Sequence, residues 1–153
     1  MTGDPKVIAA LEAAYPLEAH MHLQYRKDRG NVKFKGLKKL RSKLGEFGDD
    51  THDWMNKVQE RILFLGGDDA YQIPPLTSPN TLTAVFQNEL ALEMAAIQSY
   101  EALIAIATGV DATTVHKFQH YQMYHEQHAE WLERQLNLML AVGGEEEYIQ
   151  EKI

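Results

Sequence analysis

Two histidines three residues apart, His125 and His128, lie in the stretch QMYHEQHAEWLERQL, whose apolar spacing predicts a helix. Three-residue spacing puts both imidazoles on one face of that helix. Imidazoles on an otherwise apolar stripe can bind a metal, hydrogen bond to a buried acid, or fill the core. The choice depends on which side chains the neighbouring helices bring to the same depth.

Two glutamates lie at a matching depth on two other predicted helices. Glu18 falls midway along the first helix and Glu93 midway along the third. Two carboxylates that face one another in a helix core are costly unless a cation neutralises them. A divalent metal held by carboxylate oxygens and imidazole nitrogens does this directly. A hydrogen-bonded Glu–His network without metal is the alternative, but the convergence of two Glu and two His from three helices favours a metal.

Glycine, proline and capping residues divide the chain into helices. Asp4-Pro5 predicts the start of a first helix that ends at Gly30-Asn31 and is kinked or broken at Pro16. A second helix is predicted over 34–65, followed by the linker GDDAYQIPPLTSP. Ser78-Pro79 predicts the start of a third helix, which ends at Gly109, and Asp111 caps a fourth that stops at Gly143-Gly144. The tail after Gly144 predicts one or two further turns.

These segments predict one all-α domain over residues 1–153. Short turns join the first pair and the last pair of helices into two antiparallel hairpins. The long linker crosses the length of the bundle, so the second and third helices can run parallel. The core stripe predicted on the second helix contains Leu37, Leu40, Leu44, Phe47, Thr51, Trp54, Val58, Ile62 and Leu65.

Composition narrows the classes of function. The chain has 153 residues and no cysteine, so a transition-metal site must use His, Asp or Glu. The net charge of −7 argues weakly against nucleic acid or an anionic membrane as a partner. No uniformly apolar run approaches the roughly 18–20 residues that span a bilayer. The first residues do not read as a secretory leader, which predicts a cytoplasmic protein.

Several stretches together resemble the bacterioferritins of the ferritin-like superfamily. They are GDPKVIAALEAAYPLEAHMHLQY, GLKKL, ERILFLGG, ELALEM and HAEWLERQLNLM, in the family's order. The resemblance implies a four-helix bundle with a short fifth helix, assembled into a closed shell of about 24 subunits. It also implies ferroxidase activity, in which Fe(II) is oxidised and stored as a mineral core.

The family's di-iron centre takes one Glu from each of the first and third helices and Glu-x-x-His from each of the second and fourth. By that resemblance Glu18, Glu93 and His128 match ligands, whereas His125 stands where the family has a bridging glutamate. A gapless register puts Thr51 at the second-helix Glu position and Trp54 at its His position. Recruiting Asp49 and His52 instead would need a local two-residue shift of the second helix. Asp50 could reach inward from beside Thr51.

The surviving ligands predict one metal ion per subunit, bound by Glu18, Glu93, His125 and His128, with Asp50 as a further candidate. Iron, zinc and manganese all suit these donors. Two alternatives remain open: a catalytically inactive structural subunit of a mixed shell, and a mononuclear metalloenzyme or metal sensor.

A second candidate site is suggested by the resemblance. The family's haem is held at a two-fold subunit interface by a methionine from each partner, and His52 occupies that position here. Paired histidines are good axial ligands for haem iron. The predicted neighbours of His52 are polar, so a hydrogen-bonded or metal-bridged dimer contact is the alternative.

Overall fold

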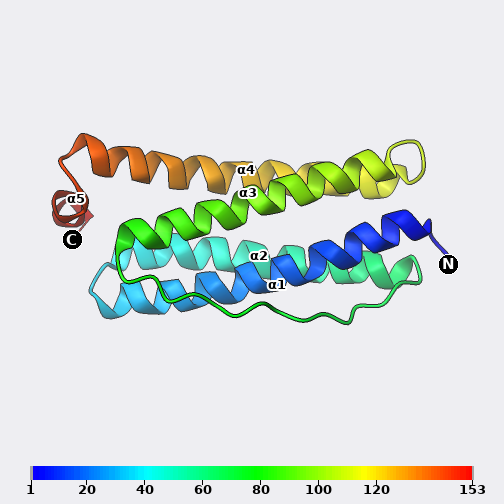
Figure 1. Cartoon of the computed structure of the whole chain (residues 1–153), viewed down its shortest axis with the longest axis horizontal. Coiled ribbons are helices and arrows are strands. Elements are labelled where there is room, and N and C mark those ends of the chain that lie inside the picture. The colour runs from blue at the N-terminus through cyan, green and yellow to red at the C-terminus, as the bar shows by residue number, and fades with distance from the viewer. Residues whose placement is uncertain (1, 153) are drawn as a thin grey trace.

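The computed structural model describes residues 2–152, which contain five helices and no strand. The helices are α1 (Pro5–Phe34), α2 (Lys38–Phe64), α3 (Leu82–Ala107), α4 (Ala112–Ala141) and α5 (Glu145–Lys152). Figure 1 shows α1 beside α2 and α3 beside α4, with the crossover running the length of the bundle and α5 lying across one end. The all-α bundle, the long crossover and the short last helix were all predicted correctly.

The start of the first helix at Asp4-Pro5 was predicted correctly, but its end and its interruption at Pro16 were predicted wrongly. α1 continues through Pro16 without interruption and past Gly30, and it ends only at Phe34. Gly30 has no left-handed backbone, whereas Gly36 has φ +86° and supplies the conformation that ends this helix. The stop signal therefore lies six residues beyond the predicted one.

The start of the third helix also differs from the prediction. The Thr81 side chain accepts the Ala84 N–H at 3.1 Å and caps α3, which begins at Leu82. The Ser78 hydroxyl instead accepts a bond from Lys27 Nζ at 2.6 Å, which ties the crossover to α1. Ser78 is therefore an anchor of the crossover and not a helix cap.

Further contacts hold the crossover against α1. His20 is buried, with Nδ1 3.2 Å from the Pro74 carbonyl oxygen. The Gln24 amide bonds to both backbone groups of Thr77, donating to its oxygen at 3.1 Å and accepting from its N–H at 2.9 Å. These bonds fix an extended segment that has no regular structure of its own.

The core has two apolar clusters with a polar layer between them. One cluster includes Tyr25, Leu44 and Leu132, and the other includes Leu11, Val58 and Phe118. Every residue of the stripe predicted on α2 is buried. The side chains that could do chemistry therefore lie mid-bundle, sealed at both ends by close-packed apolar groups.

One of the described helices, α3, is long and apolar enough to cross a membrane by length and composition alone, with a mean hydropathy of 1.4. The core helix of a bundle passes the same test. α3 packs against α1 and α4 and buries the carboxylates of Glu89 and Glu93, which agrees with a core helix.

Asp111 both caps α4 and ties it to α2. Its carboxylate accepts the Thr114 N–H at 3.0 Å and binds Arg61 Nη2 at 2.8 and 3.0 Å. We expect Asp111→Ala to lower the free energy of unfolding by about 2–3 kcal/mol, since it removes a cap and a part-buried ion pair together. Chemical denaturation would measure this.

Asp4→Ala is the matched control, because Asp4 caps α1 through the Lys6 and Val7 N–H groups and makes no ion pair with any residue in 2–152. It should cost only about 1 kcal/mol. Equal losses for the two variants would show that the Arg61 contact contributes nothing.

Candidate metal centre

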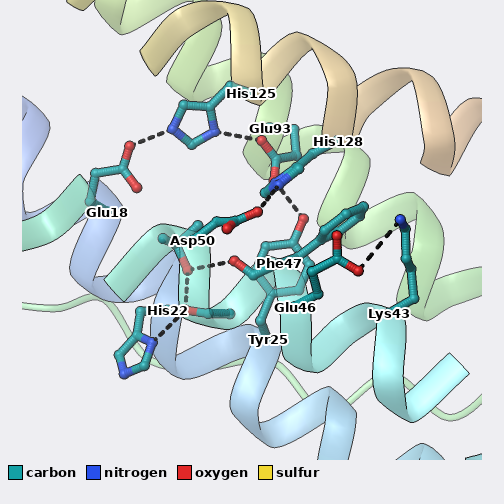
Figure 2. A network of polar contacts seen from close by, with 12 residues as sticks. Glu18, His22, Tyr25, Lys43, Glu46, Phe47, Asp50, Glu93, His125 and His128 are labelled. Atoms are coloured by element: carbon teal, nitrogen blue, oxygen red, sulfur yellow. Dashed lines mark hydrogen bonds and ion pairs between the residues drawn. The ribbon is translucent and has the colours of Figure 1, made fainter. Parts of the chain in front are cut away.

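His125 joins two buried carboxylates that come from different helices. Its Nε2 lies 2.5 Å from Glu18 Oε1, and its Nδ1 lies 2.6 Å from Glu93 Oε2. Figure 2 shows the ring between the two carboxylates, one on each side. Glu18, Glu93 and His125 are each at most 1% exposed. If both carboxyl groups are ionised they can only accept, so both ring nitrogens then carry hydrogen and the ring is an imidazolium.

His128 extends the network toward the surface. Its Nδ1 lies 2.9 Å from Glu93 Oε1, and its Nε2 lies 2.9 Å from Asp50 Oδ2 (Figure 2). The Asp50 side chain is 41% exposed, so it is the point at which the network meets solvent. The group that runs from Asp50 through His128, Glu93 and His125 to Glu18 is called here the His centre.

Two tyrosines complete the hydrogen bonding of the carboxylates. The Tyr25 hydroxyl donates to Glu93 Oε1 at 2.6 Å, and the Tyr100 hydroxyl donates to Glu18 Oε1. Burial raises the pKa of both tyrosines, and the adjacent carboxylates raise it further. Both phenols therefore remain protonated donors at neutral pH.

The acidic and basic groups of the His centre stabilise one another's charged forms. Burial alone would lower the pKa of His125, but the charges of Glu18 and Glu93 outweigh it and raise the pKa to about 10. Burial likewise opposes ionisation of Glu93, yet His125 and His128 bring its pKa down to about 2. The pKa of His128 is raised despite its burial, by hydrogen bonds to Asp50 and Glu93. At neutral pH the centre thus contains its own cation.

Aromatic rings fix the two imidazoles. Phe47 stacks on His128 with ring centroids 3.8 Å apart and an interplanar angle of 17°. The Trp54 ring centroid lies 4.4 Å from that of His125 and 5.2 Å from that of His128. Trp54 therefore occupies space beside both imidazoles on the α2 side of the centre.

The gapless register predicted for α2 agrees with the structure. Thr51 and Trp54 point into the bundle and are buried, whereas Asp49 and His52 are exposed, so the two-residue shift does not occur. Thr51 Oγ donates to the Phe47 and Gly48 carbonyl oxygens at 3.1 and 2.9 Å, so it is satisfied within its own helix. Asp50 reaches inward to His128, as expected.

Three side chains of the His centre are placed so that they could hold a metal ion. Glu93, His125 and His128 each offer a ligand atom, and these atoms lie within 4.8 Å of one another. Glu18 Oε2 is buried without a hydrogen-bond partner, which leaves a carboxylate oxygen free to ligate. A metal ion at this site would bind His125 through a lone pair on a ring nitrogen, so it would have to displace the proton that this nitrogen carries.

Tyr100 was not predicted as part of this site. It was recognised only as a member of the apolar stripe on α3. Its position seven residues after Glu93, on the same helix face, was the signal that could have identified it.

His52 lies away from the His centre, on the exposed side of α2. Its ring centroid is 4.8 Å from that of His22, and the surrounding pocket is lined by Arg26, Arg29 and Asp49 as well. The imidazole donors suit haem iron, but this charged lining does not supply the apolar walls that a porphyrin needs. Haem ligation by two copies of His52 stays a prediction.

The ionisation of the His centre should make stability depend on pH. His125 titrates near 6.5 when unfolded and near 10 when folded, so its contribution is full below about pH 6.5 and is lost as pH rises through 10. Glu93 titrates near 4.5 when unfolded and near 2 when folded, so its contribution is lost as pH falls through 2. The ion pair between His125 and Glu93 gives rise to both contributions to stability, and it is fully present between about pH 4.5 and 6.5.

We expect His125→Gln to lower the free energy of unfolding of the metal-free protein by about 3–5 kcal/mol at pH 6, because it leaves two buried carboxylates unbalanced. The difference from the parent should shrink toward pH 10. Denaturation across this pH range would measure it, with the exposed His52→Gln as control. A difference that does not vary with pH would contradict an imidazolium at position 125.

Comparison with known proteins agrees with this architecture. The family model for a ferritin-like domain matches residues 8–141. The chain is also similar to a bacterioferritin of Mycolicibacterium paratuberculosis, with 30% identity over 150 residues, which are 95% of this chain and 92% of that protein. The chain belongs to the ferritin-like family, as a relative of the bacterioferritins.

Proposed function

We propose that the chain is a cytoplasmic subunit of an iron-storage shell, whose His centre holds one metal ion in exchange for protons. The shell would contain about 24 copies, of this chain alone or with a second subunit type, and would take up Fe(II) into a mineral core. One observation carries the proposal: His125, where the family has a bridging glutamate, links Glu18 to Glu93 directly.

Charge balance limits the centre to one ion. The buried carboxylates of Glu18 and Glu93 balance either a protonated His125 or a divalent ion, but not both. A second ion would leave excess positive charge in a dry core, at a cost of several kcal/mol. Trp54 also occupies space beside both imidazoles on the α2 side, where a second ion would have to lie.

The donors set the chemistry of that ion. Two imidazoles and two carboxylates suit Fe(II), and they suit Zn²⁺ or Mn²⁺ as well. One iron cannot share the two-electron reduction of dioxygen with a neighbour. Ferroxidase activity at this centre should therefore be slow, and the shell and its mineral would carry most of the storage function.

A structural subunit without its own oxidation chemistry is the second candidate. It is favoured by the hydrogen bonding of His125 and His128, whose four ring nitrogens all face carboxylate oxygens. A purified homo-oligomer given Fe(II) under air would separate the candidates. The storage subunit should oxidise iron and load mineral alone, the structural subunit should do neither, and a mononuclear enzyme or sensor should bind one ion without loading mineral.

Metal binding should release protons. We expect one Zn²⁺ or Co²⁺ per subunit to bind at the His centre and to displace one to two protons at neutral pH, from His125 and from the protonated fraction of His128. Affinity should rise about tenfold per pH unit for each proton displaced. Calorimetry in buffers of different ionisation enthalpy would count the protons. Two ions per centre, or no proton release, would contradict the proposal.

A charge reversal offers a complementary test. His125→Glu puts a third carboxylate beside Glu18 and Glu93, so the metal-free variant should unfold well below the parent. Added Zn²⁺ should raise its melting temperature more than that of the parent, because only a cation can balance the three acids. His125→Gln, which adds no charge, is the control. A metal-free His125→Glu protein as stable as the parent would show that the centre tolerates unbalanced acids.

A further inference from the structure

A second pair of buried carboxylates lies between α1 and α3, outside the His centre. Asp28 on α1 and Glu89 on α3 have no exposed surface. The two carboxyl groups are near enough for each to shift the pKa of the other. Glu89 lies one helical turn before Glu93, and Asp28 lies one turn after Tyr25, so the pair is adjacent to the His centre and separate from it.

Most of the buried side-chain oxygens that lack a hydrogen-bond partner in the described residues belong to this pair. Four buried side-chain oxygens in residues 2–152 lack a hydrogen-bond partner, and three of them are Asp28 Oδ2, Glu89 Oε1 and Glu89 Oε2. Asp28 Oδ1 accepts a bond from Gln24 Nε2 at 3.1 Å, and the Gln24 amide is itself held by the backbone of Thr77. The crossover thus helps to fix the orientation of Asp28, and three carboxylate oxygens of the pair remain without a hydrogen-bond partner.

We propose that Asp28 and Glu89 form a second cation site, which takes a hard divalent ion such as Mn²⁺, Fe²⁺ or Ca²⁺. The donor atoms are all carboxylate oxygens, which such ions prefer, and water would complete the coordination. The proposal does not depend on metal binding at the His centre.

A cation accounts for the pair better than a shared proton does. One proton would satisfy two of the three oxygens, leaving the third without a partner and a net negative charge in the core. A divalent ion contacts all three oxygens and cancels both charges. Burial raises the pKa of both carboxyl groups, because an ionised carboxylate without a cation is unfavourable in the core.

The test compares Mn²⁺ binding to the assembled, chelator-stripped protein and its variants, measured by electron paramagnetic resonance. Asp28→Asn/Glu89→Gln keeps the shapes and removes both charges, so it should bind one Mn²⁺ fewer per subunit than the parent. The matched control Asp53→Asn/Glu60→Gln, which changes two exposed acids on α2, should keep the full number. His125→Gln should keep the ion at Asp28 and Glu89 even if the His centre binds none, which separates this proposal from the preceding one.

Melting temperatures and anomalous diffraction test the proposed cation site even if a variant assembles poorly. In chelator the double variant should melt above the parent, because two facing acids have been removed, and Mn²⁺ should raise only the parent's melting temperature. Manganese-edge anomalous diffraction of the parent should show a peak between Asp28 and Glu89. No peak, together with equal Mn²⁺ numbers in parent and double variant, would overturn the proposal and leave a shared proton.

Discussion

The organisation of this bundle depends on how two buried carboxylates from different helices are neutralised. Glu18 and Glu93 have almost no exposed surface, and each lies opposite the other across the core. A cation must lie between them, because two unpaired charges in a dry interior would offset much of the free energy of unfolding of a domain of this size. In this chain the protein provides that cation itself, as the imidazolium of His125.

The residues around His125 are consistent with a cation at this position. Thr51 and Trp54, neither of them an acid, occupy the inward positions of α2 beside the ring. Thr51 satisfies its hydroxyl within its own helix, and the Trp54 ring lies beside His125. His128 retains a carboxylate partner on each nitrogen, one from α3 and one from Asp50. These residues thus satisfy the hydrogen bonds and charges around His125 without a further buried ion.

The sequence predicted the fold well because its signals are local and repeated. Apolar spacing identified the full buried stripe of α2, and Asp111 identified a helix start. The errors arose where tertiary contacts override local signals, as with Ser78, which bonds to Lys27 and not to a helix end. The inward groups of the centre were also predictable, but the partner of each nitrogen was not, because a charge-bridged ring and a metal-bound ring require the same residues. Asp28 and Glu89 were missed because nothing in the sequence marks them as facing each other.

The protonation of His125 decides between a centre that carries its own cation and one that requires a metal. Neutron diffraction from crystals of the metal-free protein exchanged into deuterated buffer near pH 7 would observe it directly. We expect deuterium on both ring nitrogens of His125, one directed at Glu18 and the other at Glu93. A ring with one bare nitrogen, with a deuteron on the facing carboxylate instead, would contradict it.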